Sequence, residues 1–219
     1  MSDTTYVQLL QLAIGLVLVC SFMALWRREL VAVARVLAAQ GLGLGIVALL
    51  IGLHEHHTEL IVVSVLVALL RAVVLPGVLI RIVRAGDERR EVESLVNVPA
   101  SLLAAAGLTL VAYGTTRDVV ALAPSPEVEA IPIGVAVGLI GIFMLVARRK
   151  AVSQIMGVLM LDNGIALVAL LGTAGVPLVV ELGIAADVLV AILILQLLTS
   201  RMRTKFGATD LNQLRELHD

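Results

Sequence analysis

Three charged side chains, Arg71, Asp162 and Asp187, lie inside long apolar stretches of the sequence. A charge at the centre of a bilayer costs about 2.5–3.5 kcal/mol on insertion scales, so it is expected to face a protein interior and to have a partner. A carboxylate whose charged partner can move is a switchable proton site. Arginine stays protonated, so Arg71 can act as a counter-ion and not as a carrier. Asp162 and Asp187 are therefore the candidates for holding an exchangeable proton.

A further acid and several neutral polar residues interrupt the same stretches. Glu181 lies six residues before Asp187, about 9 Å away along a helix and about 120° around it, so the two would bracket a cavity between helices. Neutral side chains able to hold water between carboxylates, or to tie helices together, are Gln40, Gln154, Asn163 and Gln196. A second interpretation is that a salt bridge between Arg71 and one aspartate only fixes helix packing.

The elements that must position these residues are membrane-spanning helices. The chain has 219 residues, of which 60% are hydrophobic and 15% charged, whereas soluble domains are about 45–50% apolar and ~25% charged. Apolar stretches of about 20 residues recur along the chain, each long enough to cross a bilayer. We predict an all-α polytopic membrane protein with seven spans at residues 6–26, 31–53, 60–82, 98–116, 131–147, 151–173 and 176–199.

The positions of the positive charges predict the orientation. The chain has 16 Lys and Arg residues, and all except Arg71 and Arg117 lie beside alternate loops or in the C-terminal tail. By the positive-inside rule, the N-terminus is outside and the C-terminus is cytoplasmic. An odd number of spans agrees with this orientation.

Composition also argues against several classes of site. Cys20 is the single cysteine, and one thiolate cannot hold an iron–sulfur cluster or a structural zinc. The net charge of −1 gives no reason to expect nucleic-acid binding. Histidines 54, 56 and 57 lie beside Glu55 and Glu59 and could bind a divalent metal, but a solvated turn explains them as well. We therefore expect no cofactor and no resident metal.

An internal repeat is visible. A shift of 121 residues superimposes Arg27–Arg28 on Arg148–Arg149, Gly43 on Gly164 and Val47–Leu50 on Val168–Leu171. One inserted residue then places Glu59 on Glu181. We predict two related three-helix units. The expected organisation is an N-terminal three-helix unit with a cytoplasmic loop (1–97), a connecting fourth helix and outer loop (98–130), a second three-helix unit (131–200) and a cytoplasmic docking tail (201–219).

Several runs resemble component E of hydrogenase 4. They are Arg148–Gly164, Pro177–Asp187, Ala39–Gln40, Arg71–Pro76 and the tail Thr209–Leu217, and we expect the likeness to extend over nearly the whole chain. The resemblance implies a non-catalytic membrane-arm subunit of a membrane-bound NiFe hydrogenase in the cell inner (cytoplasmic) membrane. The partners that it implies are antiporter-like and quinone-subunit-like membrane proteins, and indirectly the NiFe large subunit and the iron–sulfur subunits.

Residues 131–200 also resemble the K subunit of NADH-quinone oxidoreductase (complex I). That subunit carries two membrane glutamates in a proton pathway. Asp187 lies near the second of them, and the first falls on Leu159, three residues before Asp162. The resemblance therefore implies a path for protons (or sodium ions) that includes Asp162, Asp187, Glu181 and Arg71.

Two alternatives remain open. Paired units with central charges also occur in stand-alone small ion transporters and antiporters. A purely structural helix-packing subunit would explain an Arg71–aspartate salt bridge without any ion transport.

Overall fold

The computed structural model describes residues 3–56, 58–85, 95–122 and 124–173, and within these ranges every regular element is helical. The elements are α1 (Asp3–Trp26), α2 (Leu30–His54), α3 (Thr58–Leu69), the π-helical turn η1 (Leu70–Val74), α4 (Leu75–Ala85), α5 (Val98–Leu122), the 3-10 turn η2 (Val128–Ala130), α6 (Ile131–Ala147) and α7 (Ala151–Gly172). α3, η1 and α4 form one span, Thr58–Arg84.

Six helices in the described ranges are long and apolar enough to cross a membrane. They confirm the first six predicted spans as helices. The predicted seventh span, 176–199, lies outside the described residues, as does the tail 201–219. The orientation stays a prediction.

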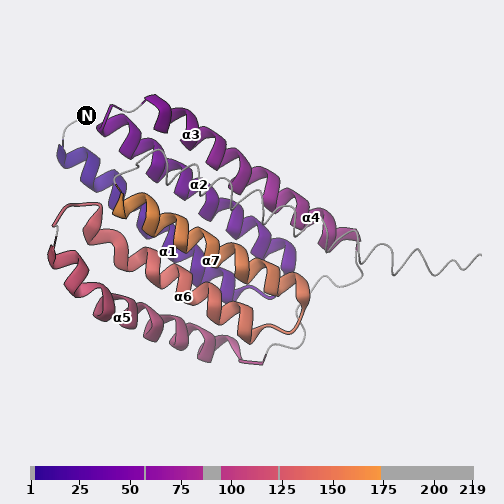
Figure 1. Cartoon of the computed structure of the whole chain (residues 1–219). Coiled ribbons are helices and arrows are strands. Elements are labelled where there is room, and N and C mark those ends of the chain that lie inside the picture. Colours follow the sequence, from indigo (N-terminus) through magenta and orange to yellow (C-terminus); the bar gives the residue numbers. More distant parts are fainter. Residues whose placement is uncertain (1–2, 57, 86–94, 123, 174–219) are drawn as a thin grey trace, which may run out of the picture.

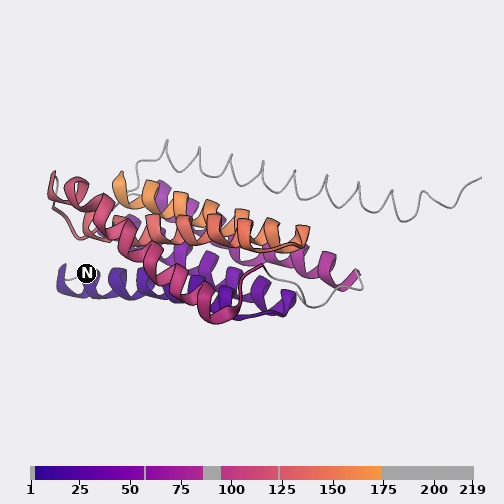
Figure 2. The ribbon, with the colours of Figure 1, turned by 90° about the horizontal axis from the view of Figure 1, so that it is seen from below.

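The helices form two packed groups that lie against each other (Figures 1 and 2). In the first group α1 packs on α2, and α2 packs on α3, η1 and α4. In the second group α5 packs on α6, and α6 packs most extensively on α7. The groups meet where α2 contacts α7 and α1 contacts α6. Segments about 120 residues apart in sequence are thus neighbours in the fold.

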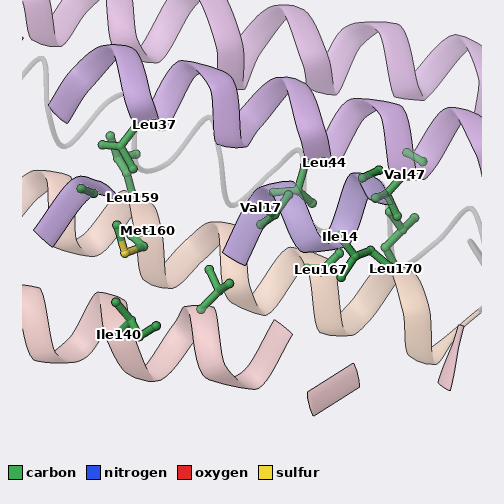
Figure 3. Packing of buried hydrophobic residues seen from close by; sticks show 14 of the residues in the cluster. Ile14, Val17, Leu37, Leu44, Val47, Ile140, Leu159, Met160, Leu167 and Leu170 are labelled. Atoms are coloured by element: carbon green, nitrogen blue, oxygen red, sulfur yellow. The ribbon is translucent and has the colours of Figure 1, made fainter. Parts of the chain in front are cut away.

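Aliphatic side chains fill the junction between the two groups. Figure 3 shows Ile14 of α1 beside Leu167 of α7, and Leu44 of α2 beside Val17 of α1. Ile14 and Leu167 are 0% exposed, and Leu44 is 2% exposed. Within the second group, a Cβ atom built at Gly164 would lie 2.6 Å from the Gly138 Cα atom, so α6 and α7 touch through their backbones. Such close contacts are typical of membrane helix pairs.

Large apolar side chains cover the outer surfaces. Val62 of α3 is 66% exposed, and Leu103 and Leu110 of α5 are 74% and 75% exposed. So much exposed aliphatic surface is unfavourable in water but suits lipid or a partner helix. The architecture is that of a multi-pass membrane protein.

The predicted fourth span is too short. Helix α5 continues to Leu122, whereas the sequence prediction ends the span at residue 116. Arg117, predicted to lie in an outer loop, is instead an exposed residue near the end of this helix. A single charge near a helix end does not interrupt the helical backbone, because its long side chain can reach the polar interface.

Candidate functional site

Arg71 lies where its span departs from α-helical geometry. In η1 the Leu75 N–H donates to the Leu70 carbonyl, five residues back. Pro76 follows this turn and has no N–H to donate, which disturbs the regular ladder of hydrogen bonds. A π-turn accommodates one extra residue and occurs frequently at functional sites. The span that carries Arg71 is therefore irregular beside Pro76, and the irregularity is a π-turn that contains Arg71.

Gly41 allows α2 to approach the backbone of Arg71. A Cβ atom at position 41 would lie 2.6 Å from the carbonyl carbon and oxygen of Arg71 and 2.8 Å from its Cβ atom. A side chain there would push the helices apart. This contact keeps the Arg71 side chain between α2 and α7, where it is 3% exposed.

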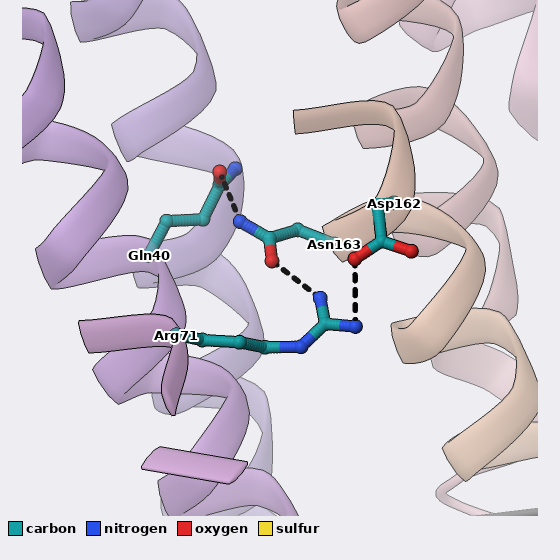
Figure 4. Close-up of polar contacts among 4 residues, drawn as sticks. All are labelled: Gln40, Arg71, Asp162 and Asn163. Atoms are coloured by element: carbon teal, nitrogen blue, oxygen red, sulfur yellow. Dashed lines mark hydrogen bonds and ion pairs between the residues drawn. The ribbon is translucent and has the colours of Figure 1, made fainter. Parts of the chain in front are cut away.

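Arg71 is held by two consecutive residues of α7 (Figure 4). Its Nη2 atom lies 2.8 Å from Oδ2 of Asp162, and its Nη1 atom donates to Oδ1 of Asn163 at 2.5 Å. The planar guanidinium group suits this two-armed contact. The Asp162 side chain is 17% exposed, so it lies at the edge of the buried region.

Hydrogen bonds extend from Asn163 into the first helix group. Asn163 Nδ2 donates to Gln40 Oε1 at 3.0 Å. Gln40 Nε2 donates to Ser21 Oγ at 2.8 Å and to the Val17 carbonyl at 3.2 Å. Gln40 and Ser21 are both 0% exposed. We call Ser21, Gln40, Arg71, Asp162 and Asn163 the central polar network.

Arg71 sets the direction of these hydrogen bonds. Arginine only donates, so Asn163 presents its oxygen to Arg71 and its NH2 group to Gln40. Gln40 must then accept through its oxygen and donate toward α1. Neither amide takes up a proton under ordinary conditions. The amides therefore position Arg71, and Asp162 is the carboxylate of the central polar network.

The structure brings together four of the residues that the sequence singled out: Gln40, Arg71, Asp162 and Asn163. Gln154 is separate, because it donates to the Arg148 carbonyl at 3.2 Å near the start of α7. The other three candidates, Glu181, Asp187 and Gln196, lie outside the described residues. Leu159, the expected counterpart of a glutamate, is 5% exposed and belongs to the apolar core.

A second polar group, not foreseen from the sequence, joins α1, α2 and the segment before η2. The Tyr6 hydroxyl donates to Glu127 Oε1 at 2.6 Å. The Tyr6 ring stacks on His54, with ring centroids 4.0 Å apart and ring planes inclined by 5°. We call Tyr6, His54 and Glu127 the tyrosine cluster. No local pattern predicts it, because Tyr6 and Glu127 are 121 residues apart.

Hydrogen bonding controls the protonation of Glu127. Burial alone would raise the pKa of Glu127, but hydrogen bonds from Tyr6, from its own backbone N–H and from Ser125, with His54 nearby, together lower it below the usual carboxyl value. The described part of the chain contains no group of three or more His, Cys, Asp or Glu residues that could hold a metal ion. His57 lies outside it.

Arg148 has a structural contact that the charge pattern did not predict. The sequence placed it with Arg149 and Lys150 in a cytoplasmic loop, but it is only 6% exposed. Its Nη2 atom donates to the Leu25 carbonyl at 3.1 Å. Leu25 belongs to the last turn of α1, where carbonyls lack intrahelical partners and favour a positive charge.

Comparison with known proteins identifies a relative over the whole chain. The sequence is 47% identical to Uncharacterized protein Rv0085 of Mycobacterium tuberculosis over 220 aligned residues, which cover 100% of both chains. The chain belongs to the family of that mycobacterial protein. No family model matches the chain, and no solved structure matches it.

Part of the chain is also similar to a component of hydrogenase 4. Hydrogenase-4 component E of Escherichia coli K12 and of Shigella flexneri is 34% identical to the chain over 87 residues. The match covers 39% of this chain and 40% of each relative. The expected resemblance is therefore found over part of the chain, not over nearly all of it.

Proposed function

We propose that the chain is a non-catalytic membrane-arm subunit of a membrane-bound NiFe hydrogenase complex and that Asp162 forms part of its ion-translocation path. The observation that carries this proposal is the Arg71–Asp162 pair, which lies in the middle of two candidate spans. The partial likeness to hydrogenase-4 component E supports the choice of complex. The electron chemistry would belong to the partner subunits.

The central polar network suits a carboxylate that changes its charge. With Asp162 ionised, the pair is neutral. When Asp162 takes up a proton on a carboxylate oxygen, the attraction to Arg71 weakens, but Asn163 continues to accept from the guanidinium group. Arg71 then stays in place and can favour release of the proton in the next step. Asp162 is partly exposed, so a route for exchange need not pass through the amides.

The remaining parts of the proposal come from the sequence. Asp187 and Glu181 would continue the path for protons or sodium ions, with Gln154 and Gln196 as supporting polar residues. The protein would lie in the cytoplasmic membrane, with its N-terminus outside and its C-terminus inside. Antiporter-like and quinone-subunit-like membrane proteins would be its direct partners, and the tail 201–219 would dock on one of them.

Asp162→Asn tests the ionic role directly. We expect this variant to assemble, because Asn can still accept a hydrogen bond from Arg71, but to lose most of the proton translocation by membrane vesicles that contain the complex. Asp162→Glu should retain part of it. Asp118→Asn is a matched control on the exposed surface of α5, and Asp187→Asn tests the second carboxylate in the same assay.

The same experiment separates the alternatives. Unchanged translocation in Asp162→Asn would contradict the ion path. Loss of assembly would instead favour the structural role, which the locked geometry of the Arg71–Asp162 pair also fits. Affinity purification in mild detergent tests the complex itself: co-purified hydrogenase-like subunits support it, and a homogeneous homo-oligomer supports a stand-alone transporter.

A further inference from the structure

The span Thr58–Arg84 changes in character along its outer surface. This span is formed by α3, η1 and α4 and lies along one edge of the helix assembly, where α3 and α4 pack on α2 (Figure 1). Between residues 62 and 74 the exposed side chains are aliphatic: Val62, Val65, Leu66, Leu69, Val73 and Val74. The exposed side chains of α4 that the structure describes are Arg81 and Arg84. The outer surface therefore passes from apolar to basic toward the C-terminal end of α4.

The π-turn keeps these exposed residues on one side of the span. In a regular α-helix Val62 and Arg81, 19 positions apart, would point about 100° away from each other around the helix axis. The extra residue in η1 takes up about one such step of rotation. Leu60 and Leu79, which are also 19 positions apart, are accordingly both buried. The exposed side is thus continuous across η1.

We call the exposed residues along this side the outer stripe. Its members are spaced by three, four or eight positions and are Val62, Leu66, Leu69, Val73, Arg81 and Arg84.

The length of the outer stripe matches the thickness of a bilayer. At 1.5 Å per residue, Val62 and Arg81 lie about 28 Å apart along the span, and the hydrocarbon core of a bilayer is about 30 Å thick. Glu59, which is exposed, precedes Val62 at the opposite end from the arginines. When the aliphatic part of the stripe lies in hydrocarbon, Arg81 and Arg84 therefore lie at the level of the lipid headgroups.

Arg81 and Arg84 are placed to hold one phosphate group together. Residues three positions apart lie on the same side of a helix, about 4.5 Å apart along its axis. Guanidinium groups bind phosphate through paired, charge-assisted hydrogen bonds. Among the residues that the structure describes, no acidic side chain forms an ion pair with either arginine. Their charges are directed to a ligand outside the described fold.

The side chains of the outer stripe suit acyl chains better than a partner helix. Membrane helices pack on each other through small residues, and the inner side of this span follows that rule: a Cβ atom at Gly45 of α2 would lie 2.5 Å from the Ala68 Cβ atom. The aliphatic part of the outer stripe consists instead of Val and Leu. Bulky, flexible surfaces of this kind fit lipid chains.

We propose that the outer stripe binds an anionic phospholipid. Arg81 and Arg84 hold the phosphate of its headgroup, and an acyl chain lies along Val73 and Leu69. From Arg81 to Leu69 the span is about 18 Å long, which is enough for the chain of a lipid in one leaflet of the bilayer. Basic clusters at the end of a membrane helix are known to select anionic lipids. The proposal goes beyond the proposed function and depends on neither the hydrogenase complex nor the ion path.

Lipid-dependent stability of the full-length protein tests the headgroup contact. In nanodiscs of phosphatidylcholine, addition of phosphatidylglycerol should raise the midpoint of thermal unfolding of the wild type. Arg81→Gln combined with Arg84→Gln should lose most of this rise, and the corresponding double substitution to Lys should keep part of it. The matched control is Arg27→Gln with Arg28→Gln, which removes two exposed charges after α1 and should keep the rise.

Photocrosslinking tests the position of the acyl chain without any substitution. Phosphatidylglycerol with a photoreactive group in its acyl chain should label the wild-type protein on the peptide that contains Leu69 and Val73. Unlabelled phosphatidylglycerol should compete for this labelling, and phosphatidylcholine should compete much less.

Each other result overturns the proposal. An equal loss in the two Gln double variants would mean that only the overall surface charge matters. A rise produced equally by glycerol phosphate would assign the arginines to a free anion. Labelling elsewhere on the chain would remove the acyl contact, and protection of the outer stripe by another protein in native membranes would assign it to a partner helix. None of these measurements uses ion translocation, so they are distinguishable from a failure of the proposed function.

Discussion

The central polar network and the tyrosine cluster meet the demands of burial in different ways. In the network, Arg71 and Gln40 are both buried, and a chain of hydrogen bonds continues from one side chain to the next. In the tyrosine cluster, Glu127 is only partly buried, and hydrogen bonds from Tyr6, Ser125 and its own backbone favour its charged form. We therefore expect the stability of the first site to depend on every partner in the hydrogen-bond chain, and the stability of the second to depend on the charge of Glu127.

The largest effect is expected from removing the central charge. Arg71→Met should destabilise the protein by about 3–5 kcal/mol, because Asp162 would stay near the core without its counter-ion. The midpoint of thermal unfolding in detergent measures this loss of stability. Arg71→Met combined with Asp162→Leu should be less destabilised than the sum of the two single variants. Additive effects would mean that the pair does not interact as the structure indicates.

An intermediate effect is expected at the contact between α2 and η1. Gly41→Ala should destabilise the protein by about 1–3 kcal/mol, since its Cβ atom would overlap the Arg71 backbone. Gly15→Ala is the matched control in α1, because a Cβ atom there has nothing within 4 Å. Thermal unfolding of the two variants, measured under the same conditions, compares their stabilities. Equal unfolding temperatures for Gly41→Ala and Gly15→Ala would contradict a tight contact at Gly41.

The smallest effect is expected in the tyrosine cluster. Tyr6→Phe keeps the ring that stacks on His54 but removes the hydrogen bond to Glu127, which is worth about 1 kcal/mol or less at a partly exposed site. Because folding lowers the pKa of Glu127, its contribution is present above the usual carboxyl pKa and is lost as the pH falls through the lowered value.

Stability measured from neutral to acidic pH tests this contribution. The difference between the wild type and Tyr6→Phe should shrink in acid. A difference that stays constant with pH would mean that Glu127 does not take part. Gly41→Ala offers the contrast, since its effect on stability should not follow the protonation of Glu127.

The helical spans were predictable from sequence, but pairing across helices was not. Apolar stretches of sufficient length identified the first six spans, and the positions of Arg71 and Asp162 within them were correct. The choice of Asp162 over Asp187 as the partner of Arg71 depends on how α3 and α7 are rotated and placed, which no local pattern encodes. Ser21 was overlooked because one hydroxyl in an apolar run is compatible with an ordinary helix. The Tyr6–Glu127 contact depends likewise on tertiary packing.

The one-way direction of the amide hydrogen bonds has a consequence for leakage. Asn163 donates to Gln40, and Gln40 donates to Ser21 and to the Val17 carbonyl of α1. If Asp162 exchanges a proton as proposed, these amides offer no ionisable group through which the proton could pass to the N-terminal helices. Helices α1 and α2 would then act as an insulator behind the acid and would leave the α7 side for any gating of charge.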